Sequence, residues 1–180
     1  YTLSLHDALP ISLGQRVVAA LQKKGFTAAY FENREQAVEH ILDRIPPGAT
    51  VGIGGSTTLR EIGVVDLLRE KGYVLYDHNA PGLQPEERTV MRYKQLSSDV
   101  FLTSTNALTL KGELVNRDAV GNRVASMFFG PKKVIVVAGV NKIVKDIDAA
   151  DARIKMVAAP MNVKRLETPN PCLKIGECAD

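Results

Sequence analysis

The feature that most constrains the fold is a short apolar strand that runs through a glycine turn into a helix. It lies between Val51 and Gly63 and reads V-G-I-G-G-S-T-T-L-R-E-I-G. The strand is predicted over residues 49–53, and apolar residues then recur at helical spacing from Leu59 to Leu68. A strand that leads at once into a helix is typical of α/β folds with a parallel sheet. The stretch therefore predicts an α/β domain.

The same glycine turn predicts one wall of an anion site. Its glycines let backbone N–H groups approach a ligand, and the hydroxyl groups that follow either cap the helix or contact an oxyanion. The free N–H groups and the dipole at a helix start favour negative charge, and an arginine one turn later adds a cation. A purely structural glycine turn is the alternative, because neither a Walker A loop nor a dinucleotide fingerprint is present. The predicted ligand contacts of this turn are Gly54, Gly55, Ser56, Thr57, Thr58 and Arg60.

The rest of the chain continues the alternation of strands and helices. Strands are predicted over residues 27–31, 49–53, 73–76, 100–103 and 134–138. The last of these is the most apolar, and we expect it at the centre of the sheet. Helices are predicted over residues 13–24, 33–44, 85–97, 122–128 and 147–157, with Asn33 and Asn122 as N-caps and with acidic residues at the start of the helix from residue 85. Residues 107–110 and 113–116 flank a Lys-Gly turn and predict a β-hairpin. We therefore expect a single α/β domain with a mostly parallel sheet, flanking helices and a β-hairpin.

Composition and charge narrow the classes of function. The chain has 180 residues and a formal charge of +3, with lysines and arginines interspersed among acidic residues, so we expect no nucleic-acid partner. No apolar run approaches the roughly 18 residues of a membrane span. The two cysteines, Cys172 and Cys178, make no disulfide framework and predict a reducing cytoplasm. Two thiols with five residues between them do not complete a zinc site, so we predict no metal and no cofactor in this chain.

The first eleven residues need a separate explanation. They read Y-T-L-S-L-H-D-A-L-P-I, which is the in-frame translation of a widely used sequencing adapter. We interpret residues 1–11 as an artefact of that origin and residues 12–180 as the domain. We expect the natural protein to begin further upstream.

Two further polar segments are predicted to complete the site. The first follows a strand end, where ligands of open α/β sheets bind, and its alternative is a local Asx turn or cap. The second is a loop dense in polar groups that precedes a predicted helix. In addition, Lys142 follows the most apolar strand, and it is either a further cation of the site or an ordinary surface lysine. These segments contribute the predicted ligand contacts Thr103, Ser104, Asn106, Asn116, Gly121, Asn122, Arg123 and Lys142.

Two ionisable groups near these segments are candidates for proton transfer. Asp118 is predicted to act as a general base or to contact a ribose, with an ion pair to Arg123 as the alternative. His78 lies in a loop rich in helix breakers and is a weaker candidate, with a surface position as the alternative.

Three segments together resemble one known family. They are G-G-S-T-T-L-R-E-I-G from residue 54, the stretch of residues 103–144 that begins T-S-T-N-A-L-T-L-K-G-E-L-V-N-R-D, and N-P-C-L-K-I-G-E-C from residue 170. They are similar to the LUD-domain family, which includes the lactate utilization protein C and YkgG groups. The resemblance implies a fold of the NagB/RpiA/CoA-transferase-like superfamily, whose members bind phosphorylated sugars, nucleotides or coenzyme A thioesters. Similar proteins carry a third cysteine just beyond Asp180, so either the chain is cut short at that end or its tail differs.

The resemblance also implies a role and a set of partners. It implies a non-redox subunit in a system that oxidises L-lactate to pyruvate together with iron–sulfur partner proteins. The subunit itself would bind a small anionic or nucleotide-like ligand. The alternatives are a free-standing CoA-transferase or sugar-phosphate isomerase, or a ligand-sensing regulatory protein.

Glu113 is the second candidate for a catalytic group, and this role rests on the resemblance. CoA transferases of the superfamily use a glutamate nucleophile, and a carboxylate is chemically suited to form an acyl-enzyme. The local sequence G-E-L-V-N does not match the transferase pattern closely. A solvated carboxylate beside a hairpin turn is therefore the alternative.

Overall fold

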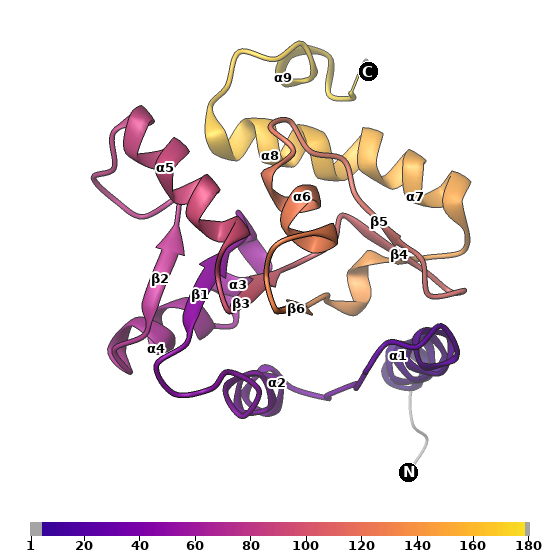
Figure 1. Cartoon of the computed structure of the whole chain (residues 1–180). Coiled ribbons are helices and arrows are strands. Elements are labelled where there is room, and N and C mark those ends of the chain that lie inside the picture. The colour runs from indigo at the N-terminus through magenta and orange to yellow at the C-terminus, as the bar shows by residue number, and fades with distance from the viewer. Residues whose placement is uncertain (1–4, 179–180) are drawn as a thin grey trace. The chain divides into compact units, whose positions relative to one another are not determined.

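The computed structural model describes residues 5–178, with side chains described from Leu13 onward. Residues 1–4 of the predicted adapter segment, and Asp180 at the other end, lie outside the described residues. Segments that alternate along the chain build two compact units (Figure 1). Unit 1 takes in the chain up to Tyr30, Thr105–Arg117 and the chain from Gly139 onward, and unit 2 takes in Phe31–Ser104 and Asp118–Ala138.

Unit 2 is built on a four-stranded parallel sheet. Its strands lie in the order β2 (Val74–Asp77), β1 (Thr50–Ile53), β3 (Val100–Thr103) and β6 (Lys133–Val136). All three pairings are parallel, so the carboxyl ends of the four strands lie at one edge of the sheet. The predicted α/β fold with a mostly parallel sheet is thus confirmed.

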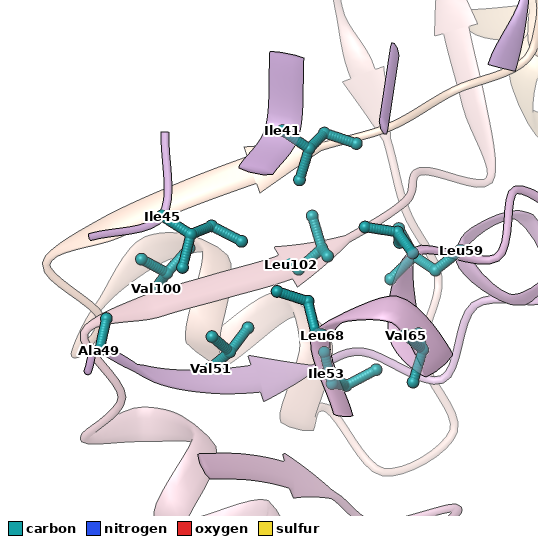
Figure 2. Packing of buried hydrophobic residues seen from close by; sticks show 11 residues of the cluster. Ile41, Ile45, Ala49, Val51, Ile53, Leu59, Val65, Leu68, Val100 and Leu102 are labelled. Carbon is teal, nitrogen blue, oxygen red and sulfur yellow. The ribbon is translucent and has the colours of Figure 1, made fainter. Parts of the chain in front are cut away.

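One face of this sheet is covered by three helices through aliphatic side chains. The helices are α2 (Arg34–Leu42), α3 (Thr57–Glu61) and α4 (Val64–Glu70). Asn33 caps α2, since its side chain accepts a hydrogen bond from the N–H of Gln36 at 2.9 Å. Figure 2 shows how Val51, Val100 and other strand residues meet these helices in one apolar cluster. The cluster consists of Ile41, Ile45, Ala49, Val51, Ile53, Leu59, Val64, Val65, Leu68, Val100 and Leu102.

The opposite face of the sheet lies against α5 (Pro85–Leu96), which is joined there by α6 (Asn122–Phe128). Side chains alternate between faces along a strand, so Gly52 points away from the aliphatic cluster. A Cβ atom on Gly52 would lie 2.8 Å from the Ser98 hydroxyl and 3.3 Å from the Cα atom of Gln95. Glycine at this position therefore allows the end of α5 to pack directly against β1.

Unit 1 contains the predicted β-hairpin and the remaining helices. Its three-stranded sheet has the order β5 (Leu114–Val115), β4 (Ala107–Thr109) and β7 (Ile143–Val144), with β4 and β5 antiparallel and β4 and β7 parallel. Helix α7 packs against all three strands. The helical elements of this unit are α1 (Leu5–Lys23), the 3-10 turn η1 (Val140–Lys142), α7 (Ile147–Arg153), the π-helical turn η2 (Ile154–Ala158), α8 (Ala159–Leu166) and α9 (Cys172–Ile175).

Four sequence-based expectations about the elements are wrong. Residues 27–31 form no strand, and the strand expected at the centre of the sheet is the edge strand β6. The helix after the glycine turn is divided into α3 and α4, because Gly63 adopts a left-handed conformation with φ 77°. The N-cap of α6 is Gly121 instead of Asn122.

Candidate functional site

The glycine turn after β1 is fixed by contacts to the neighbouring strand β3. The N–H of Gly54 donates to the carbonyl of Leu102 at 2.9 Å, and the N–H of Ser56 donates to the carbonyl of Gly54 at 2.7 Å. A Cβ atom on Gly54 would lie 2.4 Å from the hydroxyl oxygen of Thr103. The turn therefore requires glycine at position 54, where the backbone packs directly against the side chain of Thr103.

The hydroxyl group of Ser56 acts as a helix cap. It accepts a hydrogen bond from the N–H of Leu59 at 3.4 Å, and Thr57 and Thr58 form the first positions of α3. Helix α3 has only five residues, so its dipole is much smaller than that of a full helix. The capping role of Ser56 fits the structure. The affinity of any anion site at this turn must therefore come from groups other than the dipole of α3.

Arg60 is held by a buried carboxylate at the end of β2. One of its terminal nitrogens lies 3.0 Å from Oδ2 and 3.3 Å from Oδ1 of Asp77, whose side chain is only 3% exposed. The N–H of Asn79 also donates to Oδ1 of Asp77, at 2.9 Å. Asp77 therefore fixes the position of Arg60 at this edge and balances part of its charge.

A single buried glutamine connects the ends of two strands to α5. The Nε2 atom of Gln95 lies 2.8 Å from the carbonyl oxygen of Ile53, 3.0 Å from that of Tyr76 and 2.8 Å from Nδ1 of His78. Its Oε1 atom accepts a hydrogen bond from the side-chain amide of Asn122 at 3.2 Å. The side chain is fully buried, so this network sets the geometry of the sheet edge.

The contacts of Gln95 also decide which nitrogen of His78 carries the proton. The two carbonyl oxygens accept only, so the amide group of Gln95 must donate to them, and Nδ1 of His78 then shares one of its hydrogens as an acceptor. The proton of the neutral ring is therefore on Nε2. Nε2 lies 3.3 Å from the place that a Cβ atom on Gly55 would occupy, so this donor faces the glycine turn.

His78 stays neutral at physiological pH. The pKa of His78 is lowered to about 4, mainly by burial and in addition by the charges of Arg92, Arg60 and Arg88, against the opposing effect of Asp77. The side chain is 7% exposed. The surface position given as the alternative for this residue is thus wrong, and the ring offers a fixed N–H donor.

Two arginines of α5 add positive charge beside this donor. Arg88 donates through Nε to the carbonyl of Leu83 at 3.1 Å, while the Nε atom of Arg92 is buried and has no hydrogen-bond partner among the residues that the structure describes. Both charges lower the pKa of His78. The carboxyl edge of unit 2 therefore combines several cations with neutral N–H donors.

In the other polar segment of unit 2, residues 118–124, the polar side chains mainly bind one another and the start of α6. Nε of Arg123 donates to Oδ1 of Asp118 at 2.8 Å, and the N–H of Val124 donates to the second oxygen of that carboxylate at 2.9 Å. Asp118 thus stabilises the start of α6, as the ion-pair alternative proposes. Gly121 provides the left-handed cap with φ 86°, and Asn122 turns toward Gln95.

Ser104 is the last residue of the predicted set in unit 2. It follows β3 directly and is 3% exposed, and its backbone carbonyl accepts from the hydroxyl of Thr103 at 3.3 Å. Both side chains are buried, and that of Thr103 lies against the glycine turn at Gly54. Their direct contact with a ligand stays a prediction.

The remaining predicted residues belong to unit 1. Asn106 and Asn116 tie the base of the hairpin together, because the N–H of Asn106 donates to Oδ1 of Asn116 at 3.2 Å and the N–H of Arg117 donates to Oδ1 of Asn106 at 2.9 Å. Glu113 accepts a hydrogen bond from the hydroxyl of Thr109 at 2.5 Å and is half-buried. Lys142 is half-buried in η1. The roles in binding or catalysis predicted for these four residues of unit 1 stay predictions.

Among residues 13–178, whose side chains the structure describes, no group of three or more His, Cys, Asp or Glu side chains is placed to hold a metal ion. Cys172 is buried, Cys178 is half-buried, and both are free thiols. Over residues 5–178, no helix has the length and apolar character needed to cross a membrane.

Sequence reasoning missed the residues that make this edge distinctive. They are Gln95, Arg88 and Arg92, and the interpretation of His78 was incomplete. A usable signal existed, because residues 88, 92 and 95 are spaced so that they share one face of α5. The burial of His78 depends on tertiary packing and has no local signal.

Comparison with known proteins gives one match. Residues 14–180 match the family model described as the LUD domain. No curated protein and no solved structure matches the chain.

Proposed function

Because the chain belongs to the LUD domain family, which indicates a function related to lactate utilization, we propose a specific role in that process. In this proposal the protein is the non-redox subunit of a system that oxidises L-lactate to pyruvate. It belongs with the lactate utilization protein C and YkgG groups and to the NagB/RpiA/CoA-transferase-like superfamily. The parallel sheet of unit 2, with its polar carboxyl edge, is consistent with this assignment.

The observation that supports ligand binding is the set of donors at the carboxyl edge of unit 2. Arg92 has a buried nitrogen without a partner among the described residues, and neutral His78 directs Nε2–H toward the turn at Gly55. Positive charge and fixed donors together favour a small anion over a neutral or cationic ligand. We therefore propose that this subunit binds a small anionic or nucleotide-like ligand at this edge.

The proposal assigns electron transfer to other proteins. Oxidation of lactate needs a redox cofactor, and a common iron–sulfur cluster is held by four cysteines, whereas this sequence has two. We propose that the clusters are in partner proteins and that the assembly works in the cytoplasm, where free thiols such as Cys172 and Cys178 persist.

Co-expression with the genes that neighbour its own tests this proposal. The chain is expected to co-elute in size-exclusion chromatography with proteins that show iron–sulfur absorbance. L-lactate-dependent reduction of an artificial acceptor is then expected to be faster with the chain than with the partners alone. A chain that never associates with iron–sulfur proteins, and whose addition leaves the rate unchanged, would contradict the proposed role.

One observation keeps a second candidate function open. Glu113 is half-buried and accepts a short hydrogen bond, instead of being fully solvated beside its turn. This arrangement is compatible with a free-standing enzyme that uses the carboxylate on a thioester or a sugar phosphate. If the purified chain turns over such a substrate and Glu113→Gln abolishes that turnover without unfolding the protein, this second function replaces the first. A chain that binds an anion but neither turns it over nor associates with partners is instead a ligand sensor.

A further inference from the structure

A groove with a volume of about 460 Å³ lies in unit 2 between α2 and α4. Val38 and Leu42 of α2 and Ile62, which precedes α4, line its floor. Each of these side chains packs against the aliphatic cluster and stays half-buried, so part of its apolar surface faces the groove. A channel between two helices with an aliphatic floor is suited to the apolar side of a further helix.

The wall of this groove that α2 provides is acidic. Glu35, Glu39 and Asp43 follow one another at intervals of four residues, so they lie along one stripe of the helix. Glu35 is paired with Arg34 at 2.9 Å, which leaves the exposed carboxylates of Glu39 and Asp43 as the acidic part of the wall. Lys71 is a cation on the opposite wall. The groove therefore favours an occupant that brings both apolar and positively charged side chains.

Helix α8 of unit 1 has a face of this composition. None of its eight residues is fully buried, although α9 packs beside it (Figure 1). Met161 is 66% exposed, and the exposed Lys164 and Arg165 follow one turn later on the same stripe. The sequence of α8, A-P-M-N-V-K-R-L, contains no acidic residue. Its uncovered face is therefore both apolar and positively charged.

The tail of the chain is tied to the turn that precedes α8. In this turn the N–H of Ala159 donates to the carbonyl of Ile154, five residues earlier, and Pro160 has no N–H with which to continue the pattern. The carbonyl of Lys155 accepts instead from the N–H of Cys178 at 2.9 Å. The tail thus stabilises the start of α8, and the helix carries its exposed face in a defined position within unit 1.

We propose that the groove between α2 and α4 binds α8 of a second copy of this chain. Met161 of one copy then packs on the aliphatic floor of the other, and Lys164 and Arg165 face its acidic wall. The lengths agree, because helices of nine and eight residues at 1.5 Å per residue are about 14 and 12 Å long. Both surfaces belong to one polypeptide and differ from each other, so the contact is heterologous. The inference does not depend on the proposed function.

Sedimentation velocity of the full chain over a series of concentrations tests the inference. The unaltered chain is expected to form species larger than the monomer, in a proportion that rises with concentration. Glu39→Lys and Lys164→Glu each bring two like charges into the contact, so each is expected to weaken self-association by roughly tenfold. Both residues are exposed, so the variants are expected to keep the circular dichroism spectrum of the unaltered chain.

The two charge reversals also test whether the contact joins two copies. When the Glu39→Lys chain is mixed with the Lys164→Glu chain, the altered groove of the first meets the altered helix of the second, and the other pair of surfaces is unaltered. Association in the mixture is therefore expected to return to within about threefold of the unaltered chain. If either variant does not fold, the pair Asp43→Lys and Arg165→Glu provides the same exchange.

Variants outside the two surfaces serve as matched controls. Glu86→Lys in unit 2 and Lys145→Glu in unit 1 reverse exposed charges, and self-association should stay within twofold. Met161→Asp removes the apolar part of the contact and should weaken self-association at least as much as the charge reversals do. Phe128→Asp alters a side chain of α6 that is 86% exposed, and it should have no such effect.

Three results would overturn the inference. The first is an unaltered chain that stays monomeric at every concentration. The second is self-association that Phe128→Asp weakens and that Glu39→Lys and Lys164→Glu leave unchanged, because another surface then forms the contact. The third is a mixture of the two charge-reversal variants that associates no better than either variant alone, because the groove and α8 of two copies then do not meet.

Discussion

The two faces of the sheet in unit 2 are packed in opposite ways. On one face, residues such as Val51 and Leu102 meet α2, α3 and α4 through aliphatic side chains that are almost completely buried. On the other face, Gly52 replaces a side chain, and the fully buried amide of Gln95 connects α5 to the strand ends. The first face stabilises the sheet through buried apolar surface area. The second face stabilises it through a few directional hydrogen bonds.

This difference predicts where the molecule tolerates change. In an aliphatic core, the free energy of unfolding falls gradually as methyl groups are removed, because neighbouring side chains relax into part of the space. A buried polar network loses several hydrogen bonds when one member is removed, and the partners stay buried. The polar face also carries the groups proposed to bind the anion, so its geometry matters for function as well as for stability.

Gln95→Met should give the largest effect. The substitution keeps the length of the side chain but leaves the carbonyl oxygens of Ile53 and Tyr76, Nδ1 of His78 and the amide of Asn122 without this partner. Several unsatisfied buried groups should together lower the free energy of unfolding by roughly 4 kcal/mol, measured by urea denaturation. Gln36→Met, at an exposed position of α2, should stay within about 0.5 kcal/mol. Equal effects of the two variants would show that the network contributes little.

Val65→Ala tests the aliphatic face and should have the second largest effect. Val65 of α4 is fully buried, so the lost methyl groups and the remaining cavity should cost roughly 2 kcal/mol in the same denaturation experiment. Val90→Ala is the matched control, since Val90 also lies in a helix but is 50% exposed, and it should change stability by less than about 0.5 kcal/mol. The affinity for inorganic phosphate, used as a probe of the proposed anion site, should be unchanged in both variants. A large loss of affinity in Val65→Ala would mean that the two faces are not independent.

Among the groups of the polar face, His78 should be the one whose titration makes stability depend on pH. Its pKa is lowered to about 4 in the folded protein, mainly by burial, whereas the unfolded chain takes up a proton near pH 6.5. The unfolded state then binds more protons between these values, so stability is lost as the pH falls. Between pH 7.5 and 5 the expected loss is about 2 kcal/mol.

His78→Gln should remove most of this slope, and denaturation at a series of pH values measures it. His40→Gln is the control, because the pKa of His40 is also lowered by burial and by the nearby Arg44, but that residue lies in α2, away from the polar network. If the slope persists in His78→Gln and disappears in His40→Gln, the pH dependence comes from His40, which contradicts the prediction.

Ser56→Ala should give the smallest effect on stability. The hydroxyl caps a helix of only five residues through a long hydrogen bond of 3.4 Å, so the expected loss is roughly 0.5 kcal/mol by urea denaturation. Asn33→Ala removes the shorter cap of α2, with a bond of 2.9 Å, and should cost about 1 kcal/mol. Phosphate affinity should stay within twofold in both. A tenfold loss in Ser56→Ala alone would show that the hydroxyl contacts the anion.

The sequence predicted the elements of unit 2 well where local patterns determine them. The strand and glycine turn around Gly54, the cap at Asn33 and the acidic start of α5 follow from periodicity and helix-terminus chemistry. The position of β6 at the edge could not be predicted, because strand order depends on pairing between distant segments. The break at Gly63 was missed because apolar spacing continued across it.

The candidate site was predicted in part. The turn and Arg60 were identified as one wall, and the ion pair of Asp118 with Arg123 was among the alternatives. Gln95 and Arg92 were missed, since a polar residue in an amphipathic helix is usually solvated. Only the packing of α5 against Gly52 buries Gln95. Local sequence therefore indicated the glycine turn, and tertiary packing supplied the groups beside it.

Nuclear magnetic resonance of the His78 ring tests the central claim most directly. The claim is that the carboxyl edge of unit 2 holds a neutral imidazole whose Nε2–H faces an anion site. Without phosphate, the ring nitrogens should show the Nε2–H tautomer at pH 7 and a pKa of about 4. With saturating phosphate, the pKa should rise, because a nearby anion stabilises the imidazolium form. A pKa close to the ordinary 6.5 that phosphate leaves unchanged would contradict the account.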